Sequence, residues 1–161
     1  MKNITVEYLK SINACDSGIK AFESKYPNDA KLDAVIQACL DSKDNHIVSD
    51  GSWLICRCFN KSQKIQYAIY AAELVLHIYE ANYPGNKAPR KAIEAAKAYL
   101  ANPCDKTKNA AAAYAAADAA YAAADAADAA AAAATAAAAA DARNKMKIKI
   151  LNYGIKLLKT K

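Results

Sequence analysis

Apolar residues recur every three or four positions through most of the first hundred residues, which is the spacing of one helical face. The clearest run is Leu32, Val35, Ile36 and Leu40, and Asn28 or Asp29 is expected to open that helix. Proline and glycine interrupt the pattern, as they do at helix ends. It predicts helices over residues 5–11, 16–26, 29–40, 50–59, 62–82 and 89–101, with a loop within 42–51.

The stretch Ala110 to Arg143 has a different pattern, because 26 of its 34 residues are alanine. Alanine has the highest helix propensity and loses no side-chain entropy, so the stretch predicts one helix roughly 50 Å long. Its methyl-covered surface allows other helices to approach the backbone closely. We therefore expect a central rod over 110–143, against which the apolar helix 62–82 packs.

Five of the residues in this rod that are not alanine form a stripe along one side of the helix. Tyr114, Asp118, Tyr121, Asp125 and Asp128 follow at steps of four, three, four and three, and fall within an arc of about 80°. We call these five residues the acidic seam. Two interpretations stay open: the seam faces water and keeps the helix soluble, or it lines a binding groove. In the second case the groove would also hold the cationic residues Arg57, His77, Arg90 and Lys91.

The apolar residues of the last segment fit both the periodicity of a strand and that of a helix. Met146, Ile148 and Ile150 alternate as in a strand, whereas Ile148, Leu151, Ile155 and Leu158 keep helical spacing. Since no other segment offers a partner strand, we expect a basic C-terminal helix over 144–161. The whole pattern predicts an all-α protein, a single domain over 1–161 with seven or eight helices around the rod.

The net charge of +6 is unevenly distributed, because residues 143–161 hold seven basic residues and no acidic one. Such a tail suits nucleic acid, an anionic membrane or an acidic protein, or is simply a solvated lysine-rich face.

The five cysteines are an odd number without zinc-site spacing, and no cleavable signal peptide opens the chain. The alanine run is too weakly apolar to span a bilayer. We expect a soluble cytoplasmic protein.

The sequence contains no recognisable catalytic motif. The two histidines, His46 and His77, are far apart in sequence, and there is no HExxH, glycine-rich phosphate loop or nucleophile elbow. The seam aspartates lack the Glu-x-x-His pairs of di-iron bundles. We therefore expect no enzyme activity, no metal site and no cofactor.

Arg90 lies at the start of a helix, where a positive charge is unfavourable because the macrodipole is positive there. We therefore expect a carboxylate partner for Arg90, with Glu94 as the local candidate. Trp53 is expected to be a core anchor.

Five sequence blocks together resemble a known family. They are Ala14-Cys15-x-x-Gly18 with Phe22 and Tyr26-Pro27, then Trp53 to Arg57, His77 to Glu80 with Tyr83-Pro84, Pro89 to Ala96, and the tyrosine- and aspartate-punctuated alanine helix. The chain resembles, up to about Ala142, the all-helical putative immunity proteins of bacterial polymorphic-toxin systems, whose members also occur in phage genomes. The lysine-rich tail is not part of the resemblance.

The resemblance implies a non-catalytic protein that binds a cognate toxin or effector and blocks it, and the acidic seam would suit a basic nuclease toxin. It carries over no catalytic residue and fixes no oligomeric state. The alternative is a phage-type anti-defence protein that sequesters a small nucleotide-like signal, with Arg57, Arg90 and Lys91 on its phosphates. Nucleic acid and membrane are not expected partners. An ice-binding helix needs regularly spaced threonines, and Thr135 stands alone in the rod.

Overall fold

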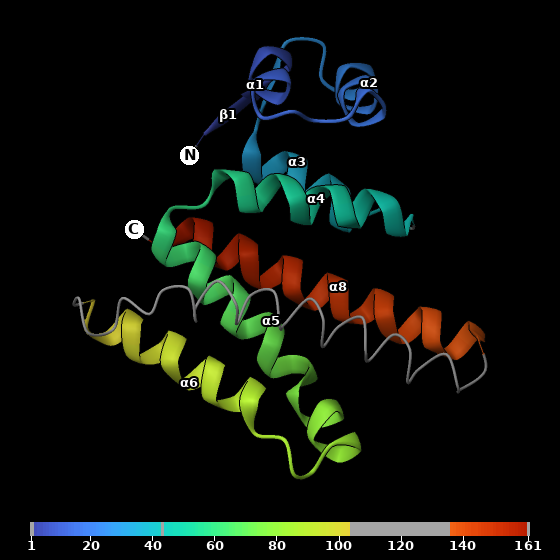
Figure 1. Ribbon diagram of the computed structural model, residues 1–161. Helices are drawn as coiled ribbons and strands as arrows, with labels where there is room; N and C mark the ends of the chain where they lie inside the picture. The colour runs from blue at the N-terminus through green and yellow to red at the C-terminus, as the bar shows by residue number, and fades with distance from the viewer. Residues whose placement is uncertain (1, 43, 104–135, 161) are drawn as a thin grey trace. The chain divides into compact units, whose positions relative to one another are not determined.

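The computed structural model describes residues 2–42, 44–103 and 136–160. The described residues form seven helices and one two-stranded sheet, so the predicted all-α class is confirmed (Figure 1). Contacts divide the chain into two compact units, Met1–Phe59 with Lys147–Lys161, and Asn60–Met146. The single domain over 1–161 stays a prediction. None of the described helices is long and apolar enough to cross a membrane.

The first unit opens with a small antiparallel sheet of β1 (Asn3–Thr5) and β2 (Asp29–Lys31), which pairs Ile4 with Ala30. The predicted helix start at Asn28 or Asp29 is therefore wrong, and α3 spans Leu32–Leu40. The backbone groups of β2 pair with β1, and this long-range pairing prevails over a local capping signal. Thr5 caps α1 (Val6–Ser11) as expected, because its side chain accepts a hydrogen bond from the Tyr8 N–H.

The next helices differ from prediction mainly at their ends. Helix α2 spans Asp16–Lys25, directly before the Tyr26-Pro27 pair that was expected to end it. Helix α4 spans Asn45–Cys58, so it begins about one turn earlier than the predicted start at Asp50. The Asp44 side chain accepts a hydrogen bond from the His46 N–H at 2.7 Å and so caps this extra turn. The predicted loop within 42–51 is correspondingly shorter.

The core of the first unit comes from four parts of the chain. Its fully buried large side chains belong to β1, α3, α4 and α8: Ile4, Leu32, Ile36, Val48, Ile55 and Leu151. Helices α3 and α4 lie side by side (Figure 1). A Cβ placed on Gly51 of α4 would lie 2.8 Å from the Cβ of Cys39 of α3, so the absence of a side chain permits this close approach. Trp53 is half-buried and lies outside this core, contrary to expectation.

The second unit contains a pair of neighbouring helices, α5 (Lys61–Asn82) and α6 (Ala88–Ala101) (Figure 1). A reciprocal capping box opens α5: the Gln63 N–H donates to the Asn60 side chain, and the Asn60 N–H donates to the Gln63 side chain. Ile69 and Ala72 of α5 pack with Ile93 and Ala96 of α6 in one buried cluster. This cluster fixes the helix pair that carries the site described below.

Helix α8 spans Ala136–Lys159, so the helical prediction for the tail is confirmed. It is continuous through Arg143 and Asn144, where we expected one helix to give way to another. The rest of the rod and its expected packing against residues 62–82 lie outside the described residues, as do all five residues of the acidic seam.

Candidate functional site

A network of polar contacts lies where α5 ends and α6 begins. We call it the α5–α6 corner and define it by Tyr79, Glu80, Tyr83, Asn86, Lys87 and Arg90. Two chain features produce it. The Tyr83-Pro84-Gly85 sequence ends α5, and Pro89 lies in the first turn of α6, where its missing N–H costs nothing. The short connection between them brings the two helix ends together.

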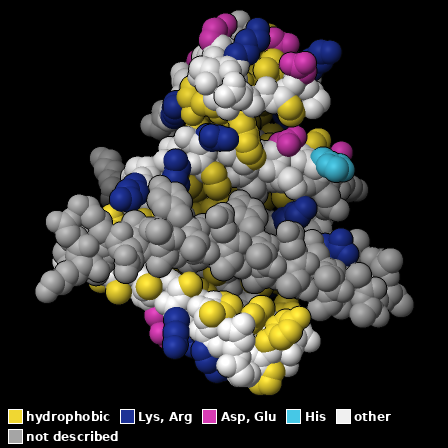
Figure 2. Space-filling model, viewed as in Figure 1, with side chains coloured by type: hydrophobic (Ala, Val, Ile, Leu, Met, Phe, Trp, Pro, Cys, Tyr) yellow, Lys and Arg dark blue, Asp and Glu magenta, His cyan; other side chains and the backbone are white. Residues whose placement is uncertain are grey.

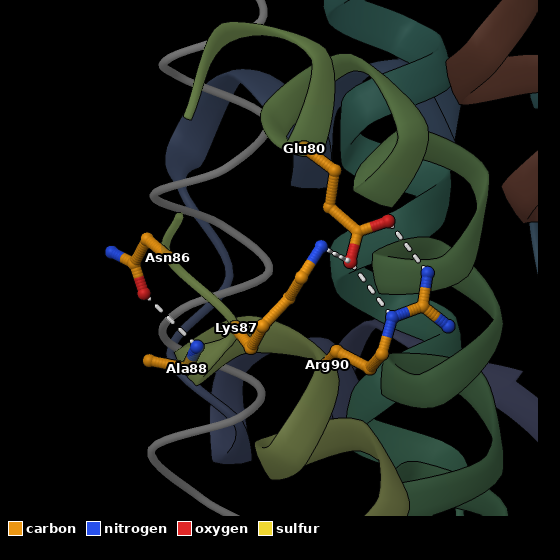
Figure 3. A network of polar contacts seen from close by, with 5 residues as sticks. All are labelled: Glu80, Asn86, Lys87, Ala88 and Arg90. Atoms are coloured by element: carbon orange, nitrogen blue, oxygen red, sulfur yellow. Dashed lines mark hydrogen bonds and ion pairs between the residues drawn. The ribbon is translucent and has the colours of Figure 1, made fainter. Parts of the chain in front are cut away.

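A two-pronged ion pair spans this corner (Figure 3). The Arg90 guanidinium donates from Nε to Oε1 of Glu80 at 2.7 Å and from a terminal nitrogen to Oε2 at 2.6 Å. Lys87 adds a longer contact, with its Nζ 3.6 Å from Oε1. The Glu80 side chain is only 17% exposed, whereas that of Arg90 is 48% exposed. The carboxylate is therefore enclosed by two cations that themselves reach solvent.

The titration behaviour of the pair follows from this geometry. The hydrogen bonds from Arg90 lower the pKa of Glu80, and the positive charges of Arg90 and Lys87 lower it further. The same bonds raise the pKa of Arg90. Both groups are thus charged across the physiological range and form a fixed structural pair. This arrangement offers binding contacts rather than a proton donor or acceptor poised for catalysis.

The predicted partner of Arg90 is corrected by this pair. We expected Glu94 on the same helix, but the hydrogen-bonded carboxylate is Glu80, ten residues earlier on α5. Glu94 acts on Arg90 only through its charge. A bidentate contact needs the carboxylate to meet the plane of the guanidinium, and the helix end opposite Arg90 supplies that geometry. The rule for neighbours on one helix face does not capture a contact across a helix hairpin.

Two tyrosines extend the corner. The rings of Tyr79 and Tyr83 lie 5.0 Å apart at an angle of 38°, and the Asn86 amide donates to the Tyr79 hydroxyl at 2.7 Å. The Asn86 side-chain oxygen in turn accepts from the Ala88 N–H at 3.0 Å, within the first turn of α6 (Figure 3). Tyr83 is 55% exposed, and hydrophobic side chains are visible at this end of the helix pair (Figure 2). The corner therefore presents an aromatic ring held by its neighbours.

The other predicted site residues are distributed over both units. His77 on α5 and Lys91 on α6 are exposed in the second unit, and Lys91 directly follows Arg90. Arg57 is exposed on α4 in the first unit, where its guanidinium carbon lies 5.3 Å from the centre of the Trp53 ring. The described residues bring together no group of three His, Cys, Asp or Glu side chains suited to a metal ion. Tyr114, Asp118, Tyr121, Asp125 and Asp128 lie outside the described residues.

Comparison with known proteins adds one match. The family model described as "Imm-5 like putative immunity protein" matches residues 56–161. The chain belongs to this family. No curated protein and no solved structure matches the chain.

The extent of the match differs from the resemblance seen in the sequence. The Imm-5 like match begins at Cys56, near the end of α4, and continues to Lys161. It therefore includes the lysine-rich tail, which is not part of the sequence resemblance. It does not include the N-terminal blocks around Cys15 and Tyr26, which are part of that resemblance. The α5–α6 corner lies wholly within the matched residues.

Sequence reasoning named only Arg90 among the six residues of the corner. Tyr79, Glu80 and Tyr83 belong to the blocks that carry the family resemblance, and Tyr83 also opens the turn that ends the helix, but the sequence did not indicate them as site residues. Asn86 and Lys87 belong to none of these blocks. One signal was available. A Tyr-Pro-Gly turn between two predicted helices indicates a helix hairpin, so residues on both sides of the turn should meet.

Proposed function

We propose that this protein is an immunity protein that binds a cognate protein toxin and blocks it without catalysing any reaction. Membership of the Imm-5 like family, over residues 56–161, is the observation that carries this proposal. An immunity protein acts by occupying a surface of the toxin, so it needs a preorganised recognition surface rather than a nucleophile or an acid–base pair.

The α5–α6 corner supports this role as a contact surface. Tyrosine and arginine are the residue types that most often carry binding energy at protein interfaces. Tyr83 is exposed and its ring lies tilted against that of Tyr79, and Arg90 is held by two hydrogen bonds. Side chains held in one conformation lose little entropy when a partner binds. We therefore assign Tyr83, Lys87 and Arg90 to the toxin interface.

The acidic seam is the second surface in this proposal. If Tyr114, Asp118, Tyr121, Asp125 and Asp128 face a groove, they fit a basic toxin, and association should then slow when salt is added. This part rests on the sequence alone.

Sequestration of a small anionic signal has less support. A phosphate at Arg90 would have to compete with the Glu80 carboxylate, which already accepts two of the guanidinium hydrogen bonds. Lys91 and His77 are exposed cation candidates nearby in sequence, but each lies on an open helix surface. A protein partner needs no vacant guanidinium, because it can contact the outer face of the ion pair.

The test is co-expression with the reading frame adjacent to this gene. That frame should arrest growth when expressed alone, and this protein should restore growth. The double variant Tyr83→Ala/Lys87→Ala, which keeps the Glu80–Arg90 pair, should restore growth poorly. Lys64→Ala, which changes an exposed lysine of α5 outside the corner, should protect like the wild type. Growth that the wild-type protein does not restore, with both proteins present at detectable levels, contradicts the proposal.

A further inference from the structure

The C-terminal residues 143–161 carry the whole positive excess of the chain. The chain has 22 basic and 16 acidic residues, and residues 143–161 contain seven basic and no acidic ones. The remaining 142 residues therefore hold 15 basic and 16 acidic residues, a net charge of −1. A positive field of this protein thus originates in α8 and its end rather than being spread over the surface.

The structure sorts the lysines of α8 into engaged and free ones. Lys145 pairs with Asp141, one turn earlier, at 2.7 Å. Lys147 donates to the Ser49 hydroxyl of α4 at 3.2 Å, within the first unit. The exposed side chains of Lys149, Lys156 and Lys159 make no hydrogen bond or ion pair with any residue that the structure describes. At about 100° per residue these three lysines fall within an arc of roughly 80°. We call them the lysine face.

The opposite side of α8 is already occupied. Leu151 is completely buried in the first unit and Leu157 is 5% exposed. An amphipathic helix that binds a membrane places its apolar face among the lipids, and here that face serves the protein core. Insertion of α8 into a membrane is therefore disfavoured, and the lysine face can bind a partner only through its positive charge.

We propose that the lysine face is a binding surface for an acidic segment of a partner protein. Lysine ammonium groups on flexible stems adapt to carboxylates at varied positions. A duplex nucleic acid favours many phosphate contacts along its length, whereas the positive excess of this chain is confined to residues 143–161 and the other 142 residues carry a net charge of −1. The aromatic residue beside the lysine face, Tyr153, is half-buried, and a base stacks on an exposed ring face. The neighbouring amide of Asn152 donates to the Ile148 carbonyl of its own helix. The inference concerns a different surface from the α5–α6 corner and does not depend on the proposed function.

The experiment measures binding of the full-length protein to three probes by fluorescence anisotropy or co-sedimentation. The probes are labelled poly-L-glutamate, labelled duplex DNA of mixed sequence, and vesicles of phosphatidylserine and phosphatidylcholine. The stripped variant is Lys149→Gln/Lys156→Gln/Lys159→Gln. The matched control is Lys10→Gln/Lys20→Gln/Lys64→Gln, which removes the same charge from exposed lysines of α1, α2 and α5.

We expect poly-L-glutamate to bind the wild type most tightly of the three probes, and more weakly at high salt. The stripped variant should bind it about tenfold more weakly, whereas the control variant should bind like the wild type. Absence of binding to poly-L-glutamate contradicts the proposal. Equal loss in both variants also contradicts it, because net charge alone would then explain the binding. Tighter binding of DNA or vesicles through the lysine face would assign the surface to another class of partner.

Discussion

Arg90 holds the Glu80 carboxylate through two hydrogen bonds. Each of the two residues lies at a helix end where the macrodipole has the same sign as its own charge, which is unfavourable. Glu80 is in the last turn of α5, where the macrodipole is negative, and Arg90 is in the first turn of α6, where it is positive. Pairing neutralises both unfavourable placements at once. The pair therefore fastens the α5–α6 connection in a way that neither residue could achieve alone.

This relationship predicts non-additive mutational effects. Glu80→Gln leaves Arg90 at an unfavourable helix end, and Arg90→Gln does the same to Glu80. We expect each single variant to lower the free energy of unfolding, and the double variant to lose less than the sum of the two. A double-mutant cycle from urea denaturation measures this coupling. Strictly additive losses would show that the two residues contribute independently.

The same pair predicts a pH dependence. Arg90 lowers the pKa of Glu80 below its ordinary value of 4.5, so the folded state binds the Glu80 proton less readily than the unfolded state does. The stabilisation is complete above pH 4.5 and is lost as the pH falls through the lowered pKa. Urea denaturation of the wild type and Glu80→Gln across this range should show their stabilities converging at low pH. A constant difference between them would contradict this assignment.

Gly51 predicts a packing effect in α4. An alanine Cβ there would lie 2.8 Å from the Cys39 Cβ and 3.1 Å from a methyl carbon of Leu151. Overpacking of this kind costs about 1–3 kcal/mol, partly offset by the roughly 1 kcal/mol higher helix propensity of alanine. Gly51→Ala should therefore lower the free energy of unfolding. Gly85→Ala is the control, since its Cβ would meet no atom within 4 Å. A Gly51→Ala protein as stable as the wild type would refute the close approach.

Two cysteines of the first unit should differ in reactivity. The Cys15 thiol is exposed, and hydrogen bonds from the Ser17 hydroxyl and the Gly18 N–H lower its pKa. Burial and the nearby Asp50 charge raise the pKa of Cys39 to about 11. Because the thiolate is the reactive form, Cys39 should react on the order of a hundredfold more slowly than an unperturbed thiol at neutral pH.

Iodoacetamide labelling followed by peptide mass mapping measures both sites in one sample. Cys15→Ser should abolish the labelling of the peptide that contains residue 15 and leave the labelling rate of Cys39 unchanged. Rapid labelling of Cys39 in the folded protein would show that its thiol is accessible.

Helix positions were predicted correctly from the sequence wherever a local signal, such as a cap residue or a proline, agreed with the tertiary packing. The Thr5 cap, the end of α2 before Pro27, the first turn of α6 around Pro89 and the helical tail were all predicted from the residues at those positions. The helical period of Ile148, Leu151 and Leu158 prevailed over the alternation around it, since Leu151 is buried in the core.

Prediction failed where residues distant in sequence decide the outcome. β2 forms because β1 lies beside it, and Glu80 meets Arg90 because a turn folds α6 back on α5. Neither pairing has a signature within one helix turn. The engagement of Lys147 with Ser49 is of the same kind, and it separates this lysine from the lysine face. The acidic seam stays a prediction from the sequence.

The most direct test of the immunity proposal is a titration of the purified product of the adjacent reading frame with this protein. Residual toxin activity is measured at increasing ratios of the two proteins. Binding without catalysis predicts that activity falls linearly and ends at a fixed stoichiometric ratio, and that toxin released by denaturation and refolding regains activity. Complete inactivation at a small fraction of that ratio, or no inactivation at any ratio, would contradict it.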